Sequence, residues 1–291
     1  MPAVFMISMS EFAATFHDAP GHGWAGLPPG PIVMGILNIT PDSFSDGGNA
    51  MDAAQAIEAG QRMIAEGAGT LDIGGESTRP GAVQVPPEEE QRRVLPVIAA
   101  LADRGVPLSV DTRNASTMVA ALDAGAAIVN DVTALAHDPA AAPLVARRGC
   151  PVVLMHMRGT PATMMAYATY GDVAAEVLAE LAARIGAAEA AGVARSSIAV
   201  DPGIGFAKTD EHNIMLLQRL PILLGLGCRI VIGVSRKRLI GRLSGVEDVK
   251  QRMAGSIAAG LYALTQGATI LRVHDVAATV QAVRTWQGLA G

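Results

Sequence analysis

The sequence predicts an α/β protein, a single-domain (β/α)₈ barrel of the TIM type in residues 32–291 with an N-terminal extension in residues 1–31. Three observations predict this fold. Eight short apolar runs recur along the chain, Ala-rich segments lie between them, and polar residues follow nearly every run. Runs of Val and Ile without polar alternation are typical of strands buried on both faces. An open, doubly wound sheet is the alternative that this pattern leaves.

Each predicted strand is placed by the residues around it. Six of the eight runs follow a glycine, the residue that best adopts the left-handed conformation at the end of a helix. In chain order, the predicted strands lie in residues 31–38, 70–75, 106–112, 126–131, 150–156, 197–203, 228–236 and 268–275. The clearest predicted helices are the Ala-rich segments 52–66, 115–123, 173–191 and 249–266. Composition does not shift along the chain, which favours one closed barrel.

Composition and the N-terminus argue against several classes of protein. Residues 1–16 are apolar but have no basic region or clear cleavage site, so we expect a strand or hairpin there and not a signal peptide. No run approaches a membrane span in length. The net charge is −5 and basic clusters are missing, which argues against a nucleic-acid partner. Cys150 and Cys228 begin apolar runs, and we expect buried, reduced thiols, which suits a cytoplasmic protein.

Polar side chains gather where the predicted strands end. In a barrel, the carboxyl ends of all strands share one rim, where active sites form. Residues that are dozens of positions apart in sequence should therefore meet in space. The strand-end residues are Asn38, Asp72, Asp111, Asn130, Asp131, His156, Asp201, Ser235, Arg236, Lys237, Arg272 and His274.

Two of the connecting loops have features of a ligand site. The loop in residues 38–48 is longer than an ordinary βα connection and carries Phe44 among polar neighbours, as expected of a mobile lid. The segment 72–82 contains glycines that permit close approach to a ligand. Its Thr78 and Arg79 could contact an anion or a planar ring, although Arg79 could equally pair with Glu76.

Asp111, Asn130 and Asp201 end three different predicted strands. Acceptor groups around one cavity suit a ligand edge with several N–H donors, because a carboxylate accepts two parallel N–H bonds well. A 2-amino-4-oxo ring has such an edge. The alternative for Asp111, and for Asp131, is a capping role at the next helix.

Basic residues follow the last two predicted strands. Ser235, Arg236 and Lys237 could form a solvated face, but they lie on the predicted active rim, where Lys237 could donate to a ring. Alternation puts Arg272 and His274 on one side of the last strand, where phosphate sites of barrels form. The alternative is a surface pair of Arg272 with Asp275. Lys208 is expected to be solvated, because the spacing of a P-loop is missing around it.

A dedicated zinc site is not expected, because the sequence shows no Cys/His set with ligand spacing. Mg²⁺ that is bound through a substrate pyrophosphate needs only one or two protein oxygens. Asn38 could supply one of them.

The motifs together resemble one family, the dihydropteroate synthases. Eight stretches occur in the family's order over residues 32–276: GILNITPDSFSDGG, DIGGESTRPGA, SVDT, NDV, LMHMRG, DPGIGF, GVSRKR and RVHDV. The departures are small, such as Ala207 at a position where glycine is common. The resemblance implies the barrel fold, a homodimer, and the joining of a pterin pyrophosphate to p-aminobenzoate.

The same resemblance implies the roles of individual residues. The positions that hold the pterin are Asp111, Asn130, Asp201 and Lys237. The pocket for the pyrophosphate and its Mg²⁺ is implied at Asn38, Arg272 and His274. p-Aminobenzoate would be framed by Ser235, Phe44, Pro80 and Lys237, and the two closing loops would contribute Asp46, Thr78 and Arg79. The groups implied to take part in the chemistry are Asp46, Lys237, Arg272 and His274.

Two rival functions remain at this point. A pterin-binding barrel of a corrinoid methyltransferase would share the Asp and Asn positions, but it has no reason to carry a pyrophosphate pocket at Arg272 and His274. An inactive paralogue that binds pterins without condensing them is the second rival.

Overall fold

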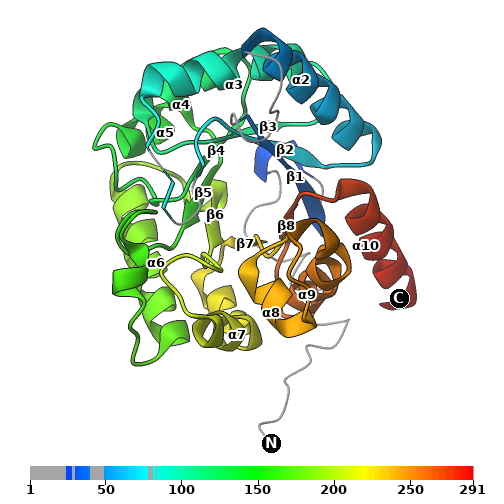
Figure 1. The fold of residues 1–291 in the computed structure, drawn as a ribbon. Helices are drawn as coiled ribbons and strands as arrows, with labels where there is room; N and C mark the ends of the chain where they lie inside the picture. The colour runs from blue at the N-terminus through cyan, green and yellow to red at the C-terminus, as the bar shows by residue number, and fades with distance from the viewer. Residues whose placement is uncertain (1–23, 28–29, 40–48, 78–80, 83, 291) are drawn as a thin grey trace, which may run out of the picture.

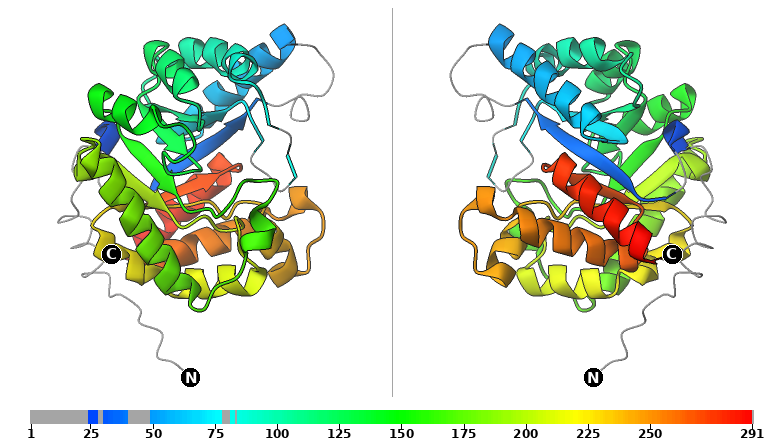
Figure 2. Two further views of the ribbon diagram at one scale, coloured as in Figure 1. Left: turned by 90° about the vertical axis from the view of Figure 1, so that its left-hand side faces the viewer. Right: turned by 90° about the vertical axis from the view of Figure 1, so that its right-hand side faces the viewer.

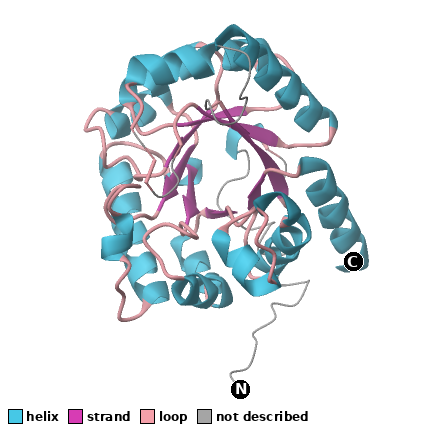
Figure 3. Cartoon of the chain, viewed as in Figure 1, coloured by secondary structure: helices cyan, strands magenta, loops and turns pink. Residues whose placement is uncertain are grey.

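Eight parallel strands close into a barrel that helices surround (Figure 1; Figure 3). The computed structural model describes residues 24–27, 30–39, 49–77, 81–82 and 84–290. The strands are β1 (Ile32–Asn38), β2 (Thr70–Gly74), β3 (Leu108–Asp111), β4 (Ile128–Asp131), β5 (Val152–Met155), β6 (Ile198–Asp201), β7 (Arg229–Ile232) and β8 (Ile270–Val273). They follow sequence order around the barrel, and β8 pairs with β1. Each lies within a predicted run, so the closed barrel is confirmed and the open sheet is wrong.

Helices cover the outside of the barrel, as the two side views in Figure 2 show. They are α2 (Asn49–Ala65), α3 (Pro87–Leu101), α4 (Ala115–Asp123), α5 (Ala141–Arg148), α6 (Val173–Ala190), α7 (Asp210–Gln218), α8 (Arg238–Ser244), α9 (Met253–Thr265) and α10 (Val276–Ala290). Five of the six glycines that precede predicted runs have the positive φ expected at a helix end: Gly105, Gly125, Gly149, Gly192 and Gly267. Before β2 the positive φ is at Gly67 and not at Gly69. None of the described helices is long and apolar enough to cross a membrane.

The helix predicted in residues 249–266 begins later than expected. Residues 249–266 form the short 3₁₀ helix η5 (Val249–Gln251) and then α9, which begins at Met253. The guanidinium of Arg252 between them donates to the carbonyl oxygens of Val246 at 3.0 Å and Glu247 at 2.6 Å. These bonds hold the chain before α9 in a turn, so the helix does not extend back to Val249.

The hydrophobic core has two parts. The larger part lies between the strands and the helices and contains residues such as Val110, Leu154, Leu181 and Ile232. The smaller part fills the inside of the barrel with Trp24, Leu27, Ile32, Met34, Ile128, Val153, Ala199, Val231 and Ile270. Trp24 lies in η1 (Trp24–Gly26), and its indole N–H donates to the carbonyl oxygen of Ser197 at 2.8 Å. Trp24, near the end of the N-terminal extension, therefore packs into the barrel interior.

The strand period of two residues explains why the next interior layer is polar. Ile128, Ala199 and Ile270 belong to the inner apolar cluster. Two residues further along the same strands come Asn130, Asp201 and Arg272, which must point to the same side. An apolar layer thus lies below a charged layer at the carboxyl ends of the strands.

Candidate active site

Arg272 of β8 lies at the centre of the charged layer. Its Nε donates to Oδ2 of Asp72 at 2.6 Å, and its Nη2 donates to Oδ2 of Asp111 at 2.8 Å. Asp72 and Asp111 come from β2 and β3, and both are buried. A buried carboxylate needs a cation and hydrogen bonds to offset its loss of hydration. Arg272 provides both, and it joins residues that are 200 and 161 positions away in sequence.

Asp72 also orients two neighbouring side chains. Its Oδ1 accepts from the hydroxyl of Ser109 at 2.6 Å, and its Oδ2 accepts from Nδ2 of Asn130 at 2.9 Å. The second bond sets which way the Asn130 amide is turned. Asp72 was expected at a strand end, without a role in the site. The signal that could have found it is a carboxylate in the middle of a strand buried on both faces, which requires a cationic partner.

The electrostatics of this cluster follow from two carboxyl groups around one guanidinium. Burial and the nearby Asp72 carboxylate raise the pKa of Asp111 to about 8, while Arg272 opposes the shift. Burial lowers the pKa of Arg272, but Asp72 and Asp111 together outweigh it and raise that pKa above its ordinary value. Arg272 therefore stays charged at neutral pH beside the two carboxyl groups.

Asp201 and Lys237 bring two opposite charges to the same layer, near enough for each to affect the pKa of the other. Oδ2 of Asp201, Nζ of Lys237 and Cβ of Arg272 lie 3.9, 3.9 and 4.0 Å from the position that a Cβ atom of Gly233 would occupy. Burial raises the pKa of Asp201, with Lys237 opposing, and burial lowers the pKa of Lys237 to about 8, with Asp201 opposing. The glycine leaves open the space in which these groups meet.

A second glycine keeps the opposite side of the layer open. Oδ2 of Asp111 and Oδ1 of Asn38 lie 3.6 and 3.7 Å from the position of a Cβ atom on Gly74. Asn38 is the last residue of β1 and is half-buried. An amide oxygen and a carboxyl oxygen are hard donors of the kind that Mg²⁺ prefers.

Ser235 and His274 contact each other at the ends of β7 and β8. The Ser235 hydroxyl oxygen lies 3.0 Å from Nδ1 of His274 and accepts the backbone N–H of His274 at 3.1 Å. Arg236, between Ser235 and Lys237, donates its Nε to Oδ2 of Asp275 at 3.0 Å. The surface pair of Arg272 with Asp275 is therefore wrong, because Arg236 occupies Asp275 and Arg272 points into the barrel.

The helix-capping alternative is wrong for both Asp131 and Asp111, since the residue that precedes the next helix after Asp131 is Ala140. Asp131 accepts the backbone N–H groups of Thr133 at 2.7 Å and Leu135 at 3.0 Å, so it stabilises the turn after β4. Asp111 bonds Arg272 instead, and the first N–H of α4, that of Ala115, is accepted by Asp138.

The two cysteines are buried and unpaired with each other, as the sequence predicted.

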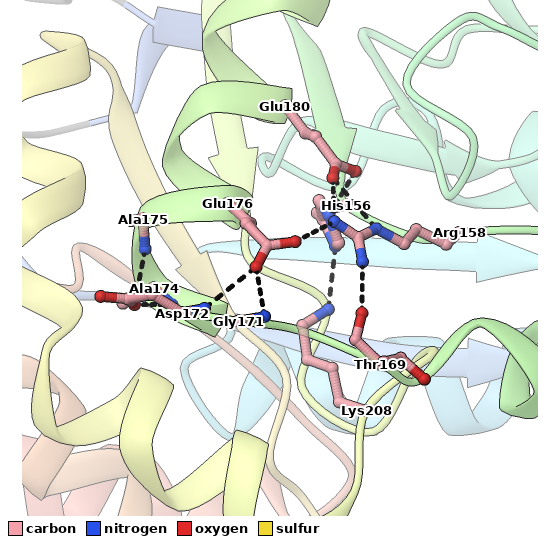
Figure 4. A network of polar contacts seen from close by, with 10 residues as sticks. All are labelled: His156, Arg158, Thr169, Gly171, Asp172, Ala174, Ala175, Glu176, Glu180 and Lys208. Atoms are coloured by element: carbon pink, nitrogen blue, oxygen red, sulfur yellow. Dashed lines mark hydrogen bonds and ion pairs between the residues drawn. The ribbon is translucent and has the colours of Figure 1, made fainter.

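The prediction that Lys208 is solvated is wrong. Its side chain is among the largest that are completely buried, with only 1% of the residue exposed. Its Nζ contacts Nδ1 of His156 at 2.9 Å (Figure 4). It also contacts the carbonyl oxygens of Gly203 at 3.1 Å and Phe206 at 3.0 Å. Three acceptors match the three N–H donors of an ammonium group, which makes burial tolerable. The burial of Lys208 cannot be predicted from sequence, because two of its acceptors are backbone carbonyl oxygens, which every residue type has.

Five predicted site residues lie outside the described part of the chain, namely Phe44, Asp46, Thr78, Arg79 and Pro80. Glu76, which comes just before three of them, is described. Its Oε1 accepts from Nη2 of Arg113 at 2.8 Å.

Across the residues that the structure describes, His, Cys, Asp and Glu side chains nowhere form a group of three or more that could hold a metal ion. The oxygens near Gly74 fit an ion that brings most of its ligands with a substrate.

Comparison with known proteins identifies the family. The model of the pterin binding enzymes matches residues 34–274. The dihydropteroate synthase of Neisseria meningitidis serogroup C is 49% identical over 263 residues, which are 89% of this chain and 93% of that protein. Among solved structures, Xanthomonas albilineans dihydropteroate synthase with 4-aminobenzoic acid has a TM-score of 0.87 and 50% identity, covering 93% of this chain and 98% of the other.

A second structure of the Xanthomonas albilineans enzyme, in complex with 7,8-dihydropteroate, has a TM-score of 0.83 and 49% identity and covers 92% of this chain and 97% of the other. The matched residues include every strand of the barrel except the first two residues of β1, and nearly all of the charged layer. The chain therefore belongs to the pterin binding enzyme family and, within it, to the dihydropteroate synthases.

Proposed function

We propose that the charged layer binds 6-hydroxymethyl-7,8-dihydropterin pyrophosphate beside p-aminobenzoate and joins them into 7,8-dihydropteroate. The bond between the pterin methylene carbon and the pyrophosphate oxygen breaks, the arylamine nitrogen bonds that carbon, and the arylamine releases a proton. The observation that carries the proposal is the convergence of Asp111, Asn130, Asp201, Lys237 and Arg272 in one interior layer. The relatives with 4-aminobenzoic acid and 7,8-dihydropteroate support this choice of substrates.

The pterin ring is assigned to Asp111, Asn130, Asp201 and Lys237. A carboxylate accepts the paired N–H groups of a 2-amino-4-oxo ring in the same way as it accepts a guanidinium. Asp201 is the best placed for this role, since its Oδ1 is held by a backbone N–H and its Oδ2 faces the open space beside Gly233. Lys237 then donates to a ring nitrogen or carbonyl oxygen from the other side of that space.

The departing pyrophosphate is assigned to Arg272 and His274, with Asn38 as the protein ligand of Mg²⁺. Bound Mg²⁺ supplies charge neutralisation for the leaving group. Arg272 and His274 hold donors at the same end of the barrel, where the charge on the leaving oxygens develops. The side chain of Arg272 is 20% exposed although it bonds two carboxyl groups, so one edge of the guanidinium faces the rim.

The second substrate is assigned to the rim itself. Ser235 and Lys237, with Phe44 and Pro80, would frame p-aminobenzoate, and Asp46, Thr78 and Arg79 would come from the two loops that close over it. Asp46 would stabilise the positive charge on the pterin methylene group. A neutral arylamine is already nucleophilic, so positioning of the two substrates supplies most of the catalysis.

The direct test is turnover by the full chain. The protein is incubated with the pterin pyrophosphate, labelled p-aminobenzoate and Mg²⁺, and the product is separated and counted. Labelled dihydropteroate that requires all three components is expected. Folded protein that forms no product, or that binds methyltetrahydrofolate without turnover, would support the inactive paralogue or the methyltransferase type instead.

Affinity for the pterin pyrophosphate should fall as the pH rises from 7 to 9. Lys237 carries a proton below its pKa of about 8 and loses both charge and a donor above it. Asp111, whose pKa is also about 8, gains negative charge over the same range, but it does so equally in the wild-type chain and in the Lys237→Arg variant compared below. The expected loss is roughly tenfold, the size of one charged hydrogen bond. Isothermal titration calorimetry at several pH values measures it. Lys237→Arg stays charged throughout this range, so its affinity should fall less steeply. Equal slopes in both proteins would show that Lys237 is not the titrating group.

The assembly proposed for the chain is a homodimer in the cytoplasm, with residues 1–31 as an extension of the barrel domain. Four of the exposed large apolar side chains lie in α8, η5 and α9, which are neighbours in the fold: Leu243, Val249, Met253 and Tyr262. Exposed apolar patches of this kind mark protein interfaces.

Light scattering coupled to size exclusion should give twice the chain mass of 29.9 kDa. The double variant Leu243→Glu/Met253→Glu should elute as a monomer, because each glutamate would have to be buried without a partner. The same substitution at the exposed Leu289, far along α10, is the control and should leave the dimer intact. A monomeric native chain, or a dimeric double variant, would contradict this assignment.

A further inference from the structure

The loop that follows β6 holds both charged groups of the proposed pterin pocket. The backbone N–H of Gly203 donates to Oδ1 of Asp201 at 2.7 Å. The carbonyl oxygen of Ile204 accepts a hydrogen bond from Nζ of Lys237, which also lies 4.7 Å from the centre of the Phe206 ring. The conformation of residues 203–206 therefore decides where Asp201 and Lys237 point.

The backbone of this loop has positive φ values, which contacts with residues outside the loop must stabilise. Gly203, Gly205 and Ala207 have φ values of 68°, 84° and 48°. Alanine adopts such values only at a cost, which surrounding contacts must offset. A Cβ atom on Gly203 would lie 2.0 Å from the carbonyl oxygen of His156, so the loop packs directly against the end of β5.

Lys208 links the two ends of the 203–206 loop. Its Nζ donates to the carbonyl oxygens of Gly203 at 3.1 Å and Phe206 at 3.0 Å, the first and last residues of the segment. Burial lowers the pKa of Lys208 to about 7, while the Asp201 carboxylate opposes the shift. The amine thus connects the two ends of the segment without touching the open space beside Gly233.

A chain of side chains fixes the amine in turn (Figure 4). A protonated lysine can only donate, so Nδ1 of His156 is the acceptor at 2.9 Å, and Nε2–H of His156 must donate to Oε2 of Glu180 at 2.9 Å. Burial, and then the charge of Lys208, lower the pKa of His156 to about 4, which keeps the ring neutral. Arg158 holds Glu180 from the far side through its Nε at 3.0 Å.

We propose that Lys208 is a positioning residue for the pterin: its buried amine fastens the 203–206 loop, and the loop orients Asp201 and Lys237. This inference rests on the proposed pterin pocket. Lys208 does not contact the substrate. It acts through two backbone carbonyls, and His156 with Glu180 hold it in place.

The test compares Lys208→Met with Lys250→Met in the full chain. Methionine keeps the length of the side chain and removes the amine, and Lys250 is an exposed lysine in η5. Titration calorimetry with 6-hydroxymethylpterin and, separately, with inorganic pyrophosphate and Mg²⁺ gives two affinities for each protein. Lys208→Met should weaken pterin binding by about tenfold or more, the usual effect of removing a group that orients a ligand-binding residue. Pyrophosphate affinity and the KM for p-aminobenzoate should change less than about twofold, within the spread of a surface change.

A second variant covers the case in which Lys208→Met does not fold. Glu180→Ala removes the acceptor of His156 from the partly exposed face of α6, and it should weaken pterin binding by about threefold with pyrophosphate binding unchanged. Unchanged pterin affinity in folded Lys208→Met, or in Glu180→Ala if the first variant is unfolded, would overturn the proposal. An equal loss of both affinities would also overturn it, since that result describes general damage. A wild-type chain that does not bind 6-hydroxymethylpterin would instead refute the pocket itself.

Discussion

Asp201→Asn should weaken binding of the pterin pyrophosphate by about one hundredfold, which corresponds to losing a charged hydrogen bond and gaining a misdirected donor. Asp201 offers two acceptor oxygens at the end of β6, and Gly203 N–H already uses one of them. Asparagine keeps the shape but presents an N–H group to the N–H edge of the ring. Titration calorimetry with the pterin pyrophosphate measures the loss.

Asp131→Asn is the matched control for that experiment. Asp131 also ends a barrel strand, but its oxygens accept the backbone N–H groups of Thr133 and Leu135. The control should lower stability and leave pterin affinity within about twofold, because its partners are local backbone groups. Full pterin affinity in Asp201→Asn, or an equal loss in both variants, would remove Asp201 from the pterin edge.

Arg272→Met should have the second large effect, on folding as well as on binding. It leaves Asp72 and Asp111 buried without their cation, and removing one partner of a buried ion pair costs about 3–5 kcal/mol. Urea denaturation should show a free energy of unfolding lowered by that amount. Binding of the pyrophosphate substrate should be too weak to measure, because the anion pocket loses its guanidinium.

Two further variants separate these effects. Arg272→Met combined with Asp72→Asn should recover part of the lost stability, since one uncompensated carboxylate is neutralised, but it should not recover pyrophosphate binding. Arg62→Met, which breaks an exposed pair with Glu58, should leave unfolding nearly unchanged. If Arg272→Met is as stable as the wild-type chain, Arg272 does not hold the two carboxyl groups together.

The sequence was sufficient to predict the fold because its signals are local and repeat. Each predicted run contains a strand, and most of the glycines before the runs have positive φ, as Gly149 and Gly267 do. The layer of strand-end residues could also be predicted, because a period of two residues places Arg272 above Ile270 and Asp201 above Ala199. A closed barrel brings such residues together without further information.

The connections inside the site could not be predicted in the same way. Lys208 is buried because its amine meets the carbonyl oxygens of Gly203 and Phe206, and any residue could have supplied those. The role of Asp72 could be found only by knowing that β2 and β8 both flank β1, which brings Arg272 to Asp72 from a position 200 residues away in sequence. The first residue of α9 depends on the hydrogen bonds that the Arg252 guanidinium donates to the carbonyl oxygens of Val246 and Glu247. In each case the deciding partner is a long-range or a backbone group.

We expect the charged layer at the carboxyl ends of the strands to form one pterin pocket, which a crystal structure of the chain with bound 6-hydroxymethylpterin would show. The amino and ring N–H groups of the pterin should lie within about 3 Å of the Asp201 carboxylate, with Lys237 and Asn130 at the same ring. A pterin bound elsewhere, with Asp201 bonded only to protein groups, would contradict it.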